Sequence, residues 1–344
     1  MARWAAPGRR AAVRRMLDHY LRTAYSGYRV LDPARDPIRL PDACPDVIPE
    51  EIADCRQALA WFSAEHAVLL GAVRRAATDG FDTHTWRLAW ALTTFLQRRM
   101  LAQDWVDTHI AALDAVRRLG DLAPVAVTRR DLGRAHLDLG RAYGTLGRHG
   151  DARAHLGHAL ELYREPGDLV GQAYTHRYLA ILAELEGRFT GAADHARQSL
   201  RLFRAAGHRA GEARALNGLG WCLALRKDFD QALAHCRQAL PLLSEIGDRD
   251  GQAHTWDSLG YGYHHLGDHR QAISCYQRAA GLFRELGDRY FEAGILVRLG
   301  ETHRAAGDLD AARDTWESAM GIFDELGHPH GCRVRARLRG LRVS

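Results

Sequence analysis

Residues 256–279 read WDSLGYGYHHLGDHRQAISCYQRA, and this stretch decides the fold. Large apolar residues recur in it at spacings of three and four, with small residues at Gly260, Ala272 and Ala279. Such spacings place side chains on one face of an α-helix. The stretch therefore predicts two amphipathic helices that approach each other closely where the small residues lie.

The same pattern returns every 40 residues. Glycine stands at positions 167, 207, 247, 287 and 327, and again half a period away at 147, 187, 267 and 307, with Lys227 in the remaining place. Glycine just past a helix end takes the left-handed conformation at little cost, so each break predicts a helix stop. Two breaks in each period leave two helices of about 16–18 residues. Each period is therefore expected to be a helical hairpin.

The most regular unit resembles the tetratricopeptide repeat (TPR) signature. The matching residues are Trp256, Leu259, Gly260, Tyr263, Ala272, Tyr276 and Ala279. This resemblance implies an all-α fold in which helical hairpins with a 40-residue repeat stack into a right-handed solenoid. Five TPR-like repeats are expected over residues 129–327, with looser matches in the first two.

The remaining segments are expected to have different roles. Residues 1–32 predict an N-terminal amphipathic helix, the remnant of a preceding module. Residues 33–49 hold five of the ten prolines and predict an extended linker. Residues 50–128 predict degenerate helical hairpins, and residues 328–344 a basic C-terminal capping helix or tail.

Composition excludes several classes of protein. The chain has 344 residues, of which 47% are hydrophobic and 26% charged, so it can bury a core. It has no apolar run long enough to span a membrane and no signal-peptide pattern at its N-terminus. Six cysteines without a CxxC pair favour reduced thiols. We therefore expect a cytoplasmic protein with no membrane partner.

The net charge of +5 is unevenly distributed. Residues 1–48 carry +4 and residues 328–344 carry +5, so the middle of the chain is acidic. Nucleic-acid binding usually requires a basic stripe across the folded face. The sole lysine, Lys227, is not in a P-loop. We therefore expect no specific binding of nucleic acid or ATP by this chain alone.

A second resemblance covers essentially the whole chain. Short pieces such as Arg15–Tyr20, Leu31–Pro33, Ala60–Glu65 and Thr255–Tyr261 resemble the region that follows the nucleotide-binding (NB-ARC) module in AfsR-like, SARP-family bacterial transcriptional regulators. In that family the TPR array is the sensor or protein-interaction part. The resemblance implies either a fragment of such a regulator or a stand-alone sensor of the same descent, and the sequence does not choose between them.

Catalytic motifs are largely absent. The sequence has no Gly-x-Ser-x-Gly elbow, dinucleotide fingerprint or His-Glu-x-x-His. The adjacent His264 and His265 point to different helix faces, and Cys236 and Cys275 fit apolar helix positions. We therefore predict no catalytic residue, no metal site and no cofactor.

The residues that remain are those on the first helix (helix A) of each hairpin that are expected to face a concave groove. They combine aromatic rings, for contact area, with polar groups that fix orientation. The predicted groove residues are Tyr174, Arg177, Glu184, Arg214, Asn217, Trp221, His254, Asp257, Tyr261, His264, Glu301 and Arg304.

Two classes of function stay open on the sequence. The first is a non-enzymatic sensor or scaffold that binds a protein segment or a small ligand in the groove. The second is an enzyme on the TPR fold that acts on a small secondary-metabolite-type substrate, with Asp257, His254 or Glu301 as acid or base. A homo-oligomerisation domain is a further alternative.

Overall fold

The computed structural model describes residues 5–120, 125–164, 167–328 and 330–341. Over these residues the chain is all-α, with no strand. It divides into two compact units, residues 1–186 and 187–344. No helix in the described ranges is long and apolar enough to cross a membrane.

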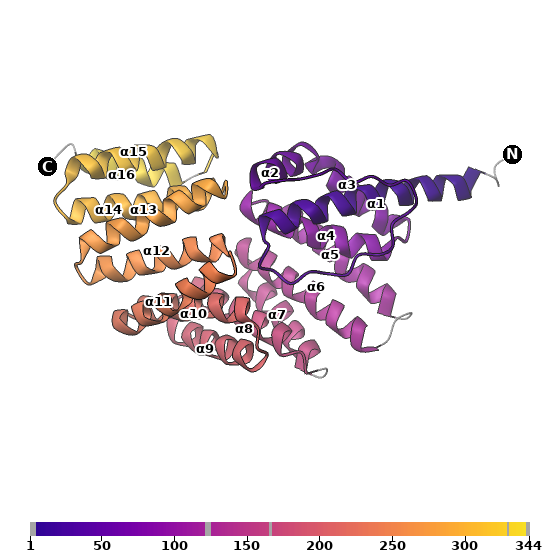
Figure 1. The fold of residues 1–344 in the computed structure, drawn as a ribbon, viewed down its shortest axis with the longest axis horizontal. Helices are drawn as coiled ribbons and strands as arrows, with labels where there is room; N and C mark the ends of the chain where they lie inside the picture. The colour runs from indigo at the N-terminus through magenta and orange to yellow at the C-terminus, as the bar shows by residue number, and fades with distance from the viewer. Residues whose placement is uncertain (1–4, 121–124, 165–166, 329, 342–344) are drawn as a thin grey trace. The chain divides into compact units, whose positions relative to one another are not determined.

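The first unit contains eight helices in its described residues (Figure 1). Helix α4 pairs with α5 and α6 pairs with α7, while α1 packs on α4. The bounds are α1 Ala5–Leu31, α2 Cys55–Ala64, α3 His66–Thr78, α4 Asp82–Arg98, α5 Ala102–Gly120, α6 Val125–Thr145, α7 His149–Arg164 and α8 Leu169–Leu185.

The second unit is more regular. Each described helix packs beside the next in chain order, and successive helices are antiparallel (Figure 1). The bounds are α9 Phe189–Ala205, α10 Arg209–Leu225, α11 Phe229–Glu245, α12 Arg249–His265, α13 His269–Glu285, α14 Arg289–Ala305, α15 Leu309–Glu325 and α16 His330–Leu341. The helix breaks predicted from the 40-residue period are confirmed.

Each break combines two local signals. The glycine that follows the helix end has a positive φ, for example +80° at Gly267 and +68° at Gly247. The residue after it often caps the next helix: Asp248 accepts a hydrogen bond from the backbone N–H of Gly251, and Asp268 from that of Gln271. A stop and a start therefore occupy two adjacent residues, which fixes the 20-residue spacing of the helices.

Glycine on each A helix lets the second helix (helix B) of the hairpin come close. A Cβ at Gly260 would lie 2.7 Å from Cε1 of Tyr276, and one at Gly300 would lie 2.4 Å from Nε1 of Trp316. Both aromatic side chains are buried. The bulky partner stands sixteen residues after the glycine in each hairpin, so the small residues have the packing role that their spacing predicted.

Residues 32–54, between α1 and α2, form a segment without a helix that turns at residues 33–35 and again at 45–46. Pro241 lies within α11, which nevertheless continues to Glu245. Because Pro241 is exposed, water can hydrogen-bond the carbonyl that loses its helical partner.

The close packing at Gly260 predicts opposite effects of the same substitution at two helical glycines. Gly260→Ala should destabilise the fold by about 1–3 kcal/mol because Tyr276 must move. Gly281→Ala should instead stabilise it, by up to about 1 kcal/mol, because a Cβ there meets nothing within 4 Å and alanine favours the helix. Urea unfolding of both variants measures the difference, and equal shifts would contradict this account.

The backbone conformation of Lys227 predicts a second effect on stability. It has φ of +66° at a position where the neighbouring repeats have glycine. A residue with a Cβ costs about 1–2 kcal/mol in this conformation. Lys227→Gly should raise the free energy of unfolding by about 0.5–1 kcal/mol, since glycine also loses backbone entropy on folding. The reciprocal Gly267→Lys should lower it, and thermal unfolding of both variants compares the two signs.

Candidate functional site

In the second unit the A helices lie on the inner side of the array. Helix α10 contacts α12 and α12 contacts α14, whereas the B helices α11, α13 and α15 make no comparable contact with one another. The side chains that project from α10, α12 and α14 away from the B helices form what we call the A-helix face.

The centre of the A-helix face is aromatic. The rings of Trp221 on α10 and Tyr261 on α12 lie with their centroids 5.1 Å apart. The ring of His265 lies 4.3 Å from that of Tyr261 and continues the row. Trp221 and Tyr261 are half-buried, so their rings contact each other and still reach solvent.

Arg298 on α14 joins this row, and the sequence reasoning missed it. Its guanidinium forms an ion pair with Asp257 and lies 5.3 Å from the ring centroid of Trp221. Burial lowers the pKa of Arg298, but the charge and hydrogen bond of Asp257, together with Tyr276 and Tyr261, raise it above its usual value. The side chain keeps 39% of its surface exposed, so a positive group remains available beside two aromatic rings.

The other predicted residues of the second unit have partners of several kinds. Nε and Nη2 of Arg214 donate to the two oxygens of the buried Asp248 carboxylate, at 2.5 and 3.0 Å. His264 shares a hydrogen bond of 3.0 Å with Thr302. His254 contacts the rings of Phe283 and Phe291. Glu301 forms ion pairs with Arg304 and Arg337. Asn217 accepts a hydrogen bond from the thiol of Cys236.

The contact at Asn217 is weak. The Cys236 Sγ donates to its Oδ1 over 3.7 Å. Burial raises the pKa of the Cys236 thiol to about 12, so it stays protonated and acts as a donor. The amide of Asn217 is half-buried and lies four residues, one helical turn, before Trp221 on α10.

The remaining three predicted residues lie on α8 in the first unit. Tyr174 packs against the apolar core of that unit. The guanidinium of Arg177 lies 5.5 Å from the ring of Tyr178, and Glu184 is half-buried near the end of the helix. Across the described part of the chain, no group of three His, Cys, Asp or Glu side chains is arranged to hold a metal ion.

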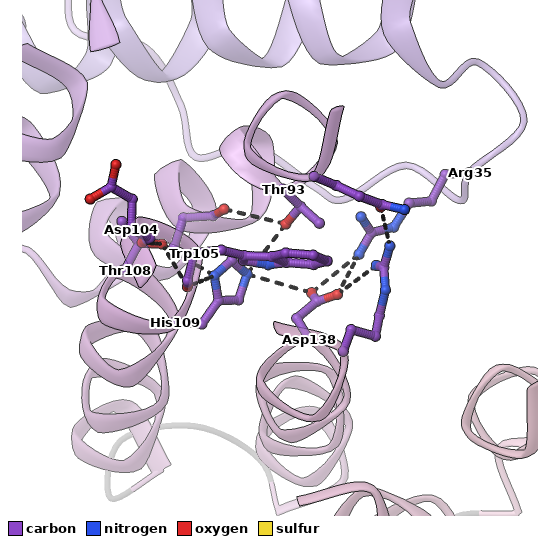
Figure 2. Close-up of polar contacts among 10 residues, drawn as sticks. Arg35, Thr93, Asp104, Trp105, Thr108, His109 and Asp138 are labelled. Atoms are coloured by element: carbon purple, nitrogen blue, oxygen red, sulfur yellow. Dashed lines mark hydrogen bonds and ion pairs between the residues drawn. The ribbon is translucent and has the colours of Figure 1, made fainter. Parts of the chain in front are cut away.

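The first unit has a charged centre of its own, drawn in Figure 2. Asp138 on α6 is almost fully buried, at 1% exposure. Its carboxylate accepts hydrogen bonds from Arg35, at 3.0 and 3.1 Å, and from Arg141, at 3.0 Å. Burial would raise the pKa of Asp138, but these two positive charges hold it below its usual value.

His109 on α5 completes this centre (Figure 2). Its Nδ1 lies 3.1 Å from the carbonyl oxygen of Trp105, which can only accept, so Nδ1 carries the hydrogen. Its Nε2 lies 3.3 Å from the Thr93 hydroxyl and 3.8 Å from Asp138. Burial lowers the pKa of His109 to about 4, so the ring is neutral near pH 7.

A family model described as tetratricopeptide repeat matches residues 134–205, 171–245, 211–285 and 249–325, which together span more than half of the chain. The chain belongs to the tetratricopeptide repeat family. Every residue of the A-helix face lies within the matched repeats. Arg35, Thr93 and His109 of the first unit's centre lie before them.

Several solved structures share the fold. BtubC from P. vanneervenii is 20% identical, with a TM-score of 0.55 over 66% of this chain and 94% of that one. A Rap protein complexed with competence and sporulation factor is 13% identical, with a TM-score of 0.57 over 84% of each chain. No curated protein sequence matches the chain.

A third similar structure is a signal transduction ATPase with numerous domains (STAND) that has a tetratricopeptide repeat sensor, from Pyrococcus horikoshii. It is 14% identical, with a TM-score of 0.55 over 83% of this chain. The match covers only 46% of the ATPase chain. At such identities the likeness shows the fold alone.

The buried centre of the first unit predicts a loss of stability in acid. An unfolded chain protonates histidine near pH 6.5, whereas folded His109 takes up its proton only near pH 4. The unfolded state therefore binds more protons between these values, and stability falls as the pH drops through that window. The lowered pKa of Asp138 adds a further loss below about pH 4.

His109→Gln should make the dependence of melting temperature on pH between 6.5 and 4 less steep, because it removes one histidine whose proton uptake is shifted to about pH 4 in the folded state. His136, whose pKa burial lowers to about 3, still contributes to this dependence. Differential scanning calorimetry of wild type and variant across this range provides the measurement. Parallel curves for the two proteins would show that His109 does not contribute.

Proposed function

We propose that this chain is a binding module whose A-helix face in the second unit holds an extended segment of a partner protein. The tetratricopeptide repeat is a scaffold for protein interaction and is generally not enzymatic. The observation that carries the proposal is the row of Trp221, Tyr261 and Arg298, because it combines partly exposed aromatic rings with an accessible guanidinium.

These groups suit an extended segment for chemical reasons. Aromatic rings supply contact area at small entropic cost, and they dominate hot spots in protein interfaces. Arg298 can donate to a backbone carbonyl or a carboxylate of the partner while its ion pair with Asp257 holds it in position. Asn217 offers an amide that can both donate and accept, which matches the alternating groups of a peptide backbone.

The module also has a proposed biological context. We propose that the module is the sensor part of, or derives from, a SARP/AfsR-like transcriptional regulator. The sequence resemblance to the region after an NB-ARC module supports this, and the shared fold with a STAND protein that has a TPR sensor is consistent with it. Co-purification of the chain with a P-loop ATPase encoded next to it would test the link.

The enzymatic alternative gains no support from the contacts of its candidate residues. Asp257 is paired with Arg298, and Glu301 with Arg304 and Arg337. His254 packs against two phenylalanine rings. Each candidate residue therefore has a structural contact that accounts for its position without a reaction.

The proposal predicts how peptide binding responds to substitution. Twelve-residue peptides selected from a random phage-displayed library on the full chain should bind it with measurable affinity in calorimetry. Trp221→Ala and Arg298→Ala should each weaken that binding at least about tenfold, as expected for hot-spot groups.

Phe189→Ala is the matched control, because Phe189 is an exposed aromatic residue on the B helix α9. It should leave peptide affinity unchanged. A library that yields no binder, or peptides that bind Trp221→Ala and Phe189→Ala equally well, would remove the A-helix face as the binding surface.

A further inference from the structure

The segment of residues 32–54, which we call the strap, has more backbone acceptors than donors. Prolines stand at positions 33, 37, 41, 45 and 49, and proline has no backbone N–H. A surface that binds the strap can therefore supply donors to its carbonyl groups. Helix α1 also accepts hydrogen bonds from strap N–H groups, through Asp18 from Cys44 and through Thr23 from Glu50.

Helices α1 and α4 supply those donors as side chains. Arg29 donates to the carbonyl oxygens of Arg35, at 2.7 Å, and of Pro33, at 3.1 Å. Arg22 donates to the carbonyl of Pro41 at 2.6 Å. Two further contacts follow the same rule, from Arg87 to the carbonyl of Arg39 and from His19 to that of Ile48. The first unit thus binds the backbone of a proline-rich segment that contains no helix.

One strap side chain enters the unit deeply. Arg35 is 15% exposed, and its Nη2 donates to both oxygens of the buried Asp138 (Figure 2). Its guanidinium carbon lies 5.1 Å from the ring centroid of Trp90 and 5.8 Å from that of Tyr28. A buried carboxylate with two aromatic faces is the environment that a planar guanidinium fits best.

Arg35 lies between two prolines, in the order Pro33-Ala34-Arg35-Asp36-Pro37. The carbonyl groups on which Arg29 acts are those of Pro33 and Arg35 themselves. Backbone recognition and the arginine anchor therefore coincide on five residues. The same donors and the same carboxylate would recognise this motif in a segment of another chain.

The fit of the strap's own arginine is incomplete. Nη1 of Arg35 is buried and has no hydrogen-bond partner among the described residues. A buried donor without a partner costs free energy, and the short connection to α1 limits how the strap can adjust. A free segment with the same motif lacks that restraint.

We propose that the first unit is a recognition site for a Pro-x-Arg-x-Pro motif in a protein segment that turns as residues 33–35 of the strap do, and that the strap is its intramolecular occupant. Asp138, Trp90 and Tyr28 receive the arginine, while Arg29 holds the flanking carbonyl groups. A tethered occupant competes at an effective concentration in the millimolar range. A partner segment therefore binds when the strap's own anchor is weakened or withdrawn.

The test uses a fluorescein-labelled peptide with the sequence of residues 31–43, LDPARDPIRLPDA, and the full-length chain. Arg35→Ala removes the internal anchor, so this variant should bind the peptide at least tenfold more tightly than wild type in fluorescence anisotropy. Arg39→Ala is the matched control, because Arg39 is an exposed strap residue whose side chain is not in the anchor site. It should behave as wild type.

Two altered peptides test the motif. Replacing the arginine at the position of Arg35 with alanine should abolish binding to the Arg35→Ala protein, and replacing it with lysine should weaken binding at least tenfold. Trp221→Ala in the Arg35→Ala background should leave the affinity unchanged, because the proposed site lies in the first unit. This outcome is independent of the function proposed for the A-helix face.

Several results would overturn the proposal. The first is that the peptide does not bind the Arg35→Ala protein at 1 mM, and the second is that the alanine-substituted peptide binds this protein as well as the original peptide. The third is that wild type and Arg35→Ala bind the peptide with equal affinity. The fourth is that Trp221→Ala abolishes binding in the Arg35→Ala background. If circular dichroism shows that Arg35→Ala does not fold, the same titrations are carried out with Arg35→Lys, and the same outcomes apply. That variant keeps the positive charge beside Asp138 but lacks the planar group.

Discussion

The second unit depends on one close contact between the two helices of a hairpin. The contact recurs in each hairpin that has a glycine on its A helix. A glycine on the A helix faces a side chain sixteen residues later, which is bulky for Gly260 (Tyr276) and Gly300 (Trp316) and smaller for Gly220 (Cys236). The hydrogen atom in place of a side chain lets the two helices come close, and the partner fills the space behind it. Because helix ends recur every 20 residues, the contact returns at the same register in successive hairpins.

That register explains why so much was predictable. A strict period places equivalent A-helix residues in rows, so the contact between the rings of Trp221 and Tyr261 follows from two positions 40 residues apart. The helix stops followed from glycines with a single physical role, the left-handed conformation. Even Lys227 takes the glycine conformation, because the packing of the flanking helices dictates the backbone at that position.

The residues that the sequence did not reveal are those whose partners lie outside the period. Arg298 contacts Asp257 across 41 residues, one position beyond the 40-residue period that predicted the groove. Arg35 and Asp138 are 103 residues apart and come from segments with no common repeat. A contact between a non-repetitive strap and a repeat helix leaves no periodic signal in the sequence. Only the folded chain brings the two charges together.

Asp138 and Arg298 occupy the same position of their A helices, four periods apart, and carry opposite charges. Each is neutralised by a group of the other sign, Arg35 for Asp138 and Asp257 for Arg298. The equivalent residues between them include Gly218 and Ser258, which are too small to form such a pair. Ion pairs with a buried partner add little net stability but fix geometry, since an unpaired charge would be costly. In a repeat fold whose backbone varies little, these few charged positions therefore distinguish one A helix from the next.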